Sequence, residues 1–398
     1  TTTGWNCDPY PETSAQYLYK VIDNYGVDVK NLMKRSGQTD FLSFEEENGQ
    51  QELGYWPSVD YIRSRAMAGS HRAGIGLIGE DNDSPGSDFL IKLAEEDDPR
   101  PIYVTAWGGA NTLSQAIWRA HQTKSPEDFK KFLNKFRLYT ITDQDMFYAL
   151  RNNFAYSSHQ WLRREFKDDL LLVWDESAWL NQNGLGVQNW DKYAELIQNH
   201  GAMGKDYPKY HYGVEGDTPS FLNVMPNGLN DPEDPTQVGW GGYHVFGISR
   251  DSITYCWTNW NQPEKDISNA YEHKFYPDEF NDFAARMAWA NDGTGNTNPV
   301  GVVNGTKSVK PLMIEAKAGE TVTLDASATY DAEGDELTFL WWQQMEHGAP
   351  VEIANPAEKT INITMPAEKT EPIHIICEVH DNGAFKLVSY RRIIISVK

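Results

Sequence analysis

The chain has few cysteines and no long apolar run, and each shortage excludes a class of protein. Its 398 residues include three cysteines: Cys7, Cys256 and Cys377. None has a CxxC or other metal-ligand spacing, so a cysteine zinc site and a disulfide framework are excluded, whereas one disulfide is compatible with the count. No run approaches 18 apolar residues, so we predict no transmembrane helix. No apolar targeting segment opens the chain, and we expect any signal peptide to have been removed.

Positive charge is also scarce. The chain has 35 Lys and Arg residues against 57 Asp and Glu residues, which gives a net charge of −22. Proteins that bind nucleic acid neutralise its phosphates with a basic stripe, and the sequence has none. We therefore expect no nucleic-acid partner. An acidic surface suits a neutral ligand better than a polyanion, although the simpler interpretation is that the charge keeps a secreted protein soluble.

Aromatic residues, by contrast, are abundant. The chain has 14 Trp, 20 Tyr and 16 Phe residues. Aromatic faces stack on the apolar faces of sugar rings while neighbouring polar groups bind the hydroxyls, but Trp and Tyr also fill protein cores. The composition therefore favours a sugar ligand only weakly.

Strand-like and helix-like segments alternate in the first 290 residues. Residues 102–107, 137–142 and 170–174 are short apolar runs, and residues 111–121 have a helical pattern. This order predicts βαβ units and a mostly parallel sheet, whose ligands bind at the carboxyl ends of the strands. The predicted strand ends carry these polar residues: Asp143, Gln144, Asp145, Asp175 and Glu176.

The composition changes after residue 290. Residues 291–304 contain much Gly, Asn and Pro, as expected for a linker. From residue 305 to 398 short alternating runs follow at residues 321–324, 337–342, 361–364, 373–379 and 392–397. Their spacing predicts an all-β sandwich of the immunoglobulin-like type.

Several motifs together resemble one known family. The longest lies in residues 215–243, and shorter ones lie in residues 2–6, 105–109, 142–145, 324–327 and 331–335. The chain resembles the nucleoside-hydrolase-like family, in the branch described as cellulose-binding proteins. The resemblance implies a nucleoside-hydrolase-like α/β domain over residues 1–290 and a secreted or periplasmic protein directed at a carbohydrate or nucleoside-like ligand.

The chain also departs from the family pattern. Nucleoside hydrolases open with a strand whose tip carries aspartates that bind calcium and activate water. This chain begins at what resembles the second strand, so the first strand is expected to be missing, and we favour truncation over loss. The histidine that usually precedes the family aspartate is replaced by Gly216.

Glu215 and Asp217 are the candidate catalytic residues. The resemblance places an aspartate like Asp217 near the ion and the sugar, which makes it the candidate calcium ligand. Across a tight turn both carboxylates reach one pocket. The alternative for Asp217 is an N-cap, because Thr-Pro-Ser follows it and Pro219 would lie just inside the helix.

The candidate substrate-binding residues are amides, acids and aromatic residues: Asn6, Trp107, Asn111, Asp143, Gln144, Trp240 and Tyr243. An amide suits a sugar diol because it both donates and accepts, although Asn6 also fits a strand-to-helix turn. Asp143 and Gln144 alternatively belong to a solvated loop. Trp240 lies between two glycines, which would let a ligand approach its face, but a core position is the more common role for any one of these aromatics.

The sandwich has two further candidate features. The acidic loop at residues 331–335 either binds calcium structurally or is a plain turn. Trp341 and Trp342 alternate across a strand, so we expect one in the core and one facing outward as a sugar platform.

Two functions from different classes fit these observations. The first is hydrolysis of a glycosidic or N-ribosyl bond through an oxocarbenium-like transition state. The second is non-catalytic binding of cellulose or another plant polysaccharide in the same cleft.

Overall fold

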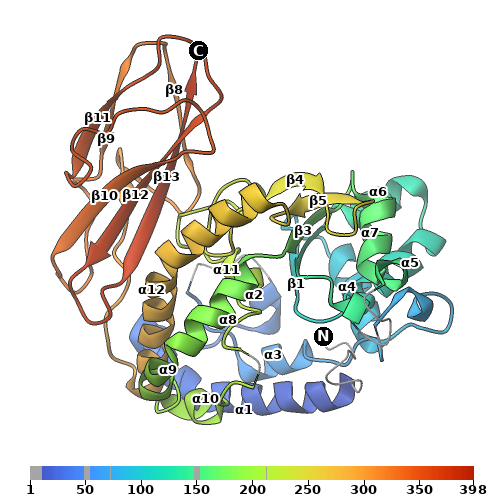
Figure 1. The fold of residues 1–398 in the computed structure, drawn as a ribbon. Helices are drawn as coiled ribbons and strands as arrows, with labels where there is room; N and C mark the ends of the chain where they lie inside the picture. Colours follow the sequence, from blue (N-terminus) through green and yellow to red (C-terminus); the bar gives the residue numbers. More distant parts are fainter. Residues whose placement is uncertain (1–10, 49–53, 72, 148–152, 212) are drawn as a thin grey trace.

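The chain forms an α/β domain followed by a β-sandwich (Figure 1). The computed structural model describes residues 11–48, 54–71, 73–147, 153–211 and 213–398. The predicted first family motif, at residues 2–6, lies outside the described residues. The mostly parallel sheet and the sandwich are both confirmed.

The α/β domain begins with helices and then alternates strands and helices. The N-terminal helices are α1 (Pro11–Ser36), α2 (Phe44–Asn48), α3 (Val59–Ser64) and α4 (Pro85–Glu95). The sheet strands are β1 (Ile102–Ala106), β2 (Phe136–Ile141), β3 (Leu171–Asp175), β4 (Val245–Ile248) and β5 (Tyr255–Thr258). The remaining helices are α5 (Asn111–Thr123), α6 (Pro126–Leu133), α7 (Ser158–Phe166), α8 (Ala178–Gln188), α9 (Trp190–Leu196), α10 (Gly201–Asp206), α11 (Pro219–Leu222) and α12 (Gln262–Asp292).

The strands of this domain pair in the order β1-β2-β3-β5-β4. The pairs β1–β2, β2–β3 and β3–β5 are parallel, and β4 closes the sheet as an antiparallel hairpin with β5. In β2, Phe136 and Leu138 belong to the core shared with α5 to α7, whereas Tyr139 and Ile141 pack on the opposite face. Because successive side chains alternate between faces, a sheet covered on both sides needs apolar residues at almost every position.

A groove of about 460 Å³ runs along the outer edge of β1. It is lined by the backbone and side chains of residues 102–110 and by apolar residues of α4, including Phe89 and Leu93. Among the described residues, β1 has a paired strand on one side alone. An unpaired edge offers free N–H and C=O groups. The expectation that the family's first strand is missing from this sheet stays a prediction.

The long helix α12 separates the sheet domain from the sandwich (Figure 1). Pro263 lies in its first turn, where no N–H is needed, and Gly293 ends it in the left-handed conformation with φ of 72°. One side of α12 contacts α1, α8 and α10. No helix of the described part combines the length and the apolar character that a bilayer crossing requires.

The sandwich has its own core. Its strands are β6 (Val302–Val303), β7 (Thr306–Lys307), β8 (Leu312–Ala316), β9 (Thr321–Asp325), β10 (Leu337–Gln344), β11 (Thr360–Thr364), β12 (Ile373–Asp381) and β13 (Val388–Val397). The sheet β10-β12-β13-β8 faces the pair β11-β9, and buried residues from both sheets, such as Leu324, Trp341 and Ile375, fill the space between them. Cys377 lies in this core and Cys256 in the α/β core, and neither is disulfide-bonded.

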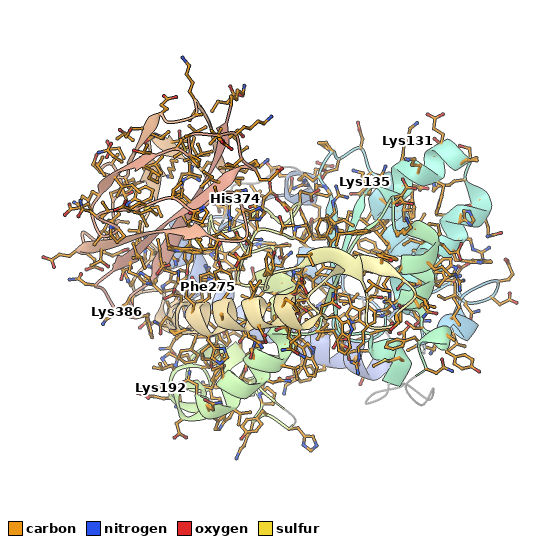
Figure 2. All side chains as sticks on the ribbon, turned by 45° about the horizontal axis from the view of Figure 1, so that its top comes forward. Lys131, Lys135, Lys192, Phe275, His374 and Lys386 are labelled. Carbon is orange, nitrogen blue, oxygen red and sulfur yellow. The ribbon has the colours of Figure 1, made fainter. Side chains whose placement is uncertain are left out.

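A mixed cluster joins the two domains. Trp240 and Phe275 of the α/β domain pack with Ile376 and Tyr390 of the sandwich. Figure 2 places Phe275 on α12, close to the sandwich. Trp342 also packs here, against Tyr271 and Phe275, with the Lys274 ammonium group 3.7 Å from its ring centroid. The expectation that the outward tryptophan forms a sugar platform is therefore wrong, because the domain interface occupies its face.

Arg392 carries the polar part of this interface. It is fully buried, and its guanidinium group donates to the carbonyls of Leu229 and Val238 in the α/β domain at 2.5 and 3.0 Å. It also contacts Gln344 at 2.7 Å and His374 at 3.0 Å within the sandwich. Burial lowers the pKa of Arg392 to about 9, so these acceptors must offset a large desolvation cost.

We predict that Arg392→Met lowers the free energy of unfolding by at least about 3 kcal/mol, because it leaves buried carbonyls without a donor. The matched control is Arg391→Met. Arg391 is also buried, but among the described residues it donates to the Lys310 carbonyl alone, and its Nε and Nη2 have no partner there. Its loss should cost about 1 kcal/mol. Urea unfolding of both variants tests this, and equal losses would contradict the assignment.

Candidate functional site

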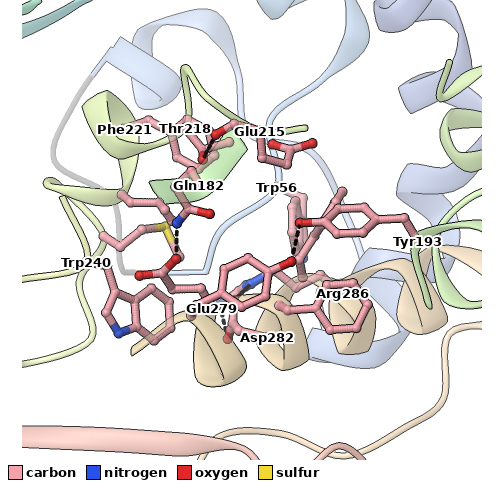
Figure 3. Close-up of a pocket in the computed structure, with 15 residues that line it drawn as sticks. Trp56, Gln182, Tyr193, Glu215, Thr218, Phe221, Trp240, Glu279, Asp282 and Arg286 are labelled. Carbon is pink, nitrogen blue, oxygen red and sulfur yellow. Dashed lines mark hydrogen bonds and ion pairs between the residues drawn. The ribbon is translucent and has the colours of Figure 1, made fainter. Parts of the chain in front are cut away.

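A pocket of about 340 Å³ opens between α8, α11 and α12 (Figure 3). Such a volume is at the small end of ligand pockets, which span about 300–1,000 Å³. Its apolar walls are formed by Leu222, Met225 and seven aromatic residues: Trp56, Tyr193, Phe221, Trp240, Tyr276, Phe280 and Phe283. Its polar lining residues are Gln182, Glu215, Thr218, Glu279, Asp282 and Arg286.

Glu279 is the buried acid of this pocket. It comes from the inner side of α12, is 7% exposed, and accepts a hydrogen bond from Gln182 through Oε2. Its other oxygen, Oε1, has no hydrogen-bond partner among the described residues. Burial raises the pKa of Glu279 well above its usual range, the Gln182 bond opposes this, and Asp278 adds repulsion.

Glu215 enters the pocket from a strained turn before α11. Its φ of 58° lies in the left-handed region, which is costly for a side-chain-bearing residue. The Thr218 hydroxyl donates to its backbone carbonyl at 2.5 Å, and Tyr207 donates to its carboxylate. Burial raises the pKa of Glu215, with repulsion from Asp217 adding to the shift and the Tyr207 bond opposing it. The turn thus fixes a second acid at the pocket.

Asp217 is an exposed residue between Glu215 and Thr218, which line the pocket, and is not a lining residue itself. Its side chain reaches solvent, yet the protein atoms crowded around it remove enough water to raise its pKa to about 6. The N-cap of α11 is Thr218, and Asp217 supplies its backbone carbonyl to Ser220. The N-cap interpretation of the Asp217 carboxylate is therefore wrong, which leaves this group available for a ligand.

Two exposed aromatic rings lie next to the pocket. Trp107, at the carboxyl end of β1, is 47% exposed, and Phe221 of α11 is 40% exposed. Their ring centroids are 6.4 Å apart with an edge-to-face angle of 79°. Phe221 lines the pocket and Trp107 lines the groove along β1, so the pair lies between the two hollows.

Comparison with known proteins places the chain in a family. A model of the family described as "Cellulose-binding Sde182, nucleoside hydrolase-like domain" matches residues 1–244, more than half of the chain. The chain belongs to this family. A second model, described as "Cellulose-binding protein Sde0182, C-terminal domain", matches residues 321–397. No curated protein matches the chain.

One solved structure agrees with the family. A nucleoside hydrolase-related hypothetical protein from Saccharophagus degradans, described as associated with carbohydrate metabolism, is 30% identical. The match covers 96% of this chain and 88% of that one, with a TM-score of 0.81. The PKD domain from KIAA 1837 protein (16% identity, 22% of this chain and 81% of that chain) has a TM-score of 0.18. The endo-fucoidan hydrolase MfFcnA4 (17% identity, 39% and 18%) has a TM-score of 0.19.

Gly216 lies against the side chain of Asn183 on α8. A Cβ atom at Gly216 would lie 2.3 Å from Oδ1 of Asn183. A side chain at position 216 would therefore require the Asn183 amide to shift.

The glycines around Trp240 also serve packing. A Cβ atom at Gly241 would lie 2.5 Å from the Asn223 Cβ atom, and one at Gly239 would lie 2.3 Å from the Asn230 Oδ1 atom. The expectation that they open the face of Trp240 is wrong. Trp240 is 1% exposed and packs edge-on against Tyr390 of the sandwich, although it also forms part of the pocket wall.

Three further candidates are buried and already bonded within the protein. Asn111 exchanges two hydrogen bonds of 2.8 Å with the backbone of Gly74. The Asp143 carboxylate accepts from the Ser157 hydroxyl at 2.7 Å and from Arg163 at 3.0 Å. Gln144 donates to the Ile141 carbonyl at 3.2 Å. These contacts hold the loops after β1 and β2 in place, so the solvated-loop alternative for Asp143 and Gln144 is wrong as well.

Three residues remain to be placed: Tyr243, Asn6 and Asp175. Tyr243 is buried in the cluster that joins the domains, outside the pocket lining. Asn6 lies outside the described residues. Asp175, at the end of β3, accepts from the backbone N–H groups of Ala178 and Trp179 at 3.0 and 2.9 Å, so it holds the start of α8.

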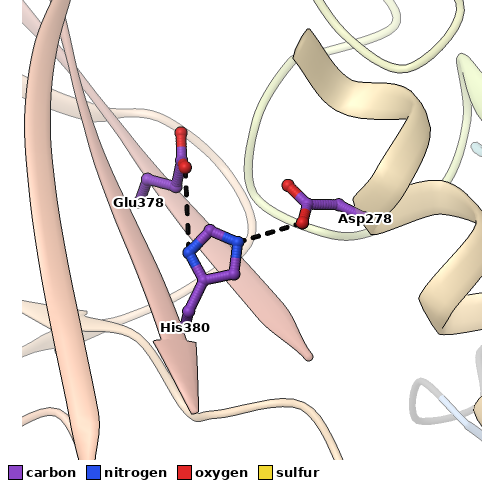
Figure 4. A group of neighbouring side chains, drawn as sticks. All are labelled: Asp278, Glu378 and His380. Carbon is purple, nitrogen blue, oxygen red and sulfur yellow. Dashed lines mark hydrogen bonds and ion pairs between the residues drawn. The ribbon is translucent and has the colours of Figure 1, made fainter. Parts of the chain in front are cut away.

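The described residues do not fit calcium at Asp217. Calcium takes 6–8 oxygen ligands, and Asp217 belongs to no group of three potential ligands in the described part of the chain. The group that does occur there, Asp278, Glu378 and His380, bridges α12 and β12 (Figure 4). Its atoms are engaged, since Tyr390 donates to Asp278 at 2.9 Å and Lys274 contacts Glu378 at 2.9 Å. In the loop at 331–335, Asp331 accepts from two backbone N–H groups, as in a plain turn.

The sequence interpretation missed the α12 side of the pocket. Tyr276, Glu279 and Phe280 lie one helical turn or less apart, and Glu272 lies two turns before Glu279 on the same face. Glu272 is 1% exposed, and neither of its carboxyl oxygens has a partner among the described residues. The sequence signal that could have revealed the α12 side of the pocket is an acid spaced with apolar residues at helical intervals.

We predict that Glu272→Gln stabilises the protein more at pH 8 than at pH 5. Burial raises the pKa of Glu272 well above its ordinary 4.5, with repulsion from Glu279 and Asp175 adding to it. The folded state thus keeps a proton that the unfolded state releases, so the free energy of unfolding falls as pH rises, by up to about 1.4 kcal/mol per pH unit. The amide has no such proton.

Thermal melts at both pH values measure this effect, and Glu352→Gln at an exposed position is the control. An identical change in melting temperature for the two variants at pH 8 would show that Glu272 ionises freely in the folded protein.

Proposed function

We propose that this chain binds carbohydrate and that the aromatic pocket between α8, α11 and α12 is its sugar site. The observation that carries the proposal is the combination of aromatic walls with polar groups inside them. Rings stack on the apolar faces of a sugar, and Gln182, Glu215 and Glu279 offer oxygens and N–H groups to its hydroxyls. The family description as cellulose-binding supports a glucan as ligand.

The exposed pair Trp107 and Phe221 extends this site. A polysaccharide is longer than a pocket of about 340 Å³, so the units outside it need a surface. The two rings lie between the pocket and the groove along β1, where neighbouring units would stack. A single sugar would occupy the pocket and the chain would continue across this pair.

We predict that Phe221→Ala weakens binding of cellotetraose about tenfold, because it removes a stacking surface from both the pocket and the ring pair next to it. Titration calorimetry measures the affinity. Tyr255→Ala, which removes an equally exposed ring on β5 away from the pocket lining, is the matched control and should leave the affinity unchanged. If the two variants behave alike, the pocket is not the sugar site.

Hydrolysis is the second candidate function, and the acids Glu215 and Asp217 favour it. A general base works best with a pKa near the working pH, and burial raises the pKa of Asp217, two residues after the pocket residue Glu215, to about 6. Its carboxylate would activate water or stabilise the positive charge that develops on the sugar. Glu215, whose pKa is raised, would supply the proton for the leaving group.

We predict that any glycosidase or nucleosidase activity rises with pH through about 6 as Asp217 ionises. Asp217→Asn keeps the shape, removes the charge and should lower the rate at least about 100-fold. Aryl glycosides, cello-oligosaccharides and nucleosides are the substrates to assay. A variant with the wild-type rate and pH profile would remove Asp217 from the mechanism and leave the binding function as the simpler description.

A further inference from the structure

The sugar pocket has an excess of acidic groups. Glu215, Glu279 and Asp282 line it, and the positive group among its lining residues is Arg286. Arg286 is committed elsewhere, because its guanidinium group binds Asp282, one turn away on α12, at 2.5 and 3.2 Å. Asp282 also accepts from Asn298 at 3.1 Å. The protein's own cations therefore compensate Asp282 and leave Glu215 and Glu279 without a counter-charge.

Glu279 is a buried acid among the residues that line the pocket. Its Oε2 is held by Gln182, which fixes the carboxyl group, and Oε1 has no partner in the described part of the chain although the residue is 93% buried. Figure 3 shows this carboxyl group below Gln182 and beside Trp240. A buried oxygen without a partner destabilises the protein, so a bound group that donates to it removes that cost.

The aromatic walls suit a positive charge. The negative face of a Trp, Tyr or Phe ring attracts an ammonium group within about 6 Å of its centroid, and the attraction grows when water is excluded. Tyr276 and Phe280 lie on either side of Glu279 on α12, and Trp240 and Tyr193 close the pocket around them. Rings and an uncompensated acid together form the usual environment of a bound amine.

We propose that the pocket recognises a protonated amine on a sugar, with Glu279 as the counter-ion, so that the ligand class is an amino sugar such as a glucosamine unit. The proposal rests on the carbohydrate-binding function and names the substrate class of that site. A neutral sugar has no positive charge to offer Glu279, whereas an ammonium group can both donate to Oε1 and lie against the rings. The net charge of −22 also favours the approach of a cationic ligand.

The test compares three tetramers by titration calorimetry at pH 6 in 0.3 M NaCl, where non-specific attraction is screened. These are the glucosamine tetramer, its N-acetylated form and cellotetraose. We expect the glucosamine tetramer to bind about tenfold or more tightly than the other two. Cellotetraose binding as tightly as the glucosamine tetramer would overturn the amine assignment and keep the carbohydrate function. Binding of none of the three would overturn both.

The charge of Glu279 is tested with a matched pair of variants. Glu279→Gln should reduce binding of the glucosamine tetramer to the level of cellotetraose. Glu272→Gln removes a buried acid from the same helix face outside the pocket lining and should leave the preference intact. Circular dichroism and melting confirm that each variant is folded. Loss of the preference in both variants, or in neither, would overturn the assignment of Glu279.

Proton release provides a measurement on the unaltered chain. Around Glu279 the ionisable groups are Glu272, Tyr276, Asp278, Asp282 and Arg286. Binding of an ammonium group should ionise Glu279 and release close to one proton, seen as a dependence of the binding heat on the ionisation enthalpy of the buffer. Cellotetraose should release none. Equal proton release for the two ligands, or none for the amine, would contradict the proposed counter-ion.

Discussion

The packing of helix α12 between the two domains is the constraint on which the rest of the structure depends. Its inner face supplies Tyr276, Glu279 and Phe280 to the pocket. Its outer face presents Tyr271 and Phe275 to the sandwich, where they pack with Trp342. A shift of this helix would therefore change the pocket and the domain interface together, because one rigid element forms a wall of both.

This arrangement is costly in one place. Glu272 and Glu279 are buried, two turns apart on the same face, and each has a carboxyl oxygen without a partner among the described residues. Apolar side chains of similar volume would pack there without desolvating a polar group. A sequence that keeps acids at such positions departs from the pattern that best supports folding, and such departures are expected at functional sites. For Glu279 the pocket supplies the reason, whereas Glu272 has no such contact.

The sequence predicted those parts of the molecule that depend on local pattern. The runs at residues 102–107, 137–142 and 170–174 are strands within one residue or so of their predicted bounds, because buried parallel strands are continuously apolar. Trp240 was misread, since its glycines pack against Asn223 and Asn230 and no local pattern reveals such partners. The pocket face of α12 was missed because it comes together with Gln182 and Trp56 only in the tertiary structure.

The sandwich also reaches the pocket through a short path of contacts. The Trp240 ring that forms part of the pocket wall donates to the Tyr390 hydroxyl of β13 at 3.4 Å. The same hydroxyl donates to Asp278 at 2.9 Å, and Asp278 directly precedes Glu279 on α12. Tyr390 thus fixes an aromatic wall and the helix turn that carries the buried acid. Since the Trp240 ring and Glu279 would both touch the ligand, the β-sandwich acts as a support of the binding site. A domain interface that supports the site in this way explains why Arg392 is buried where it binds two carbonyls of the other domain.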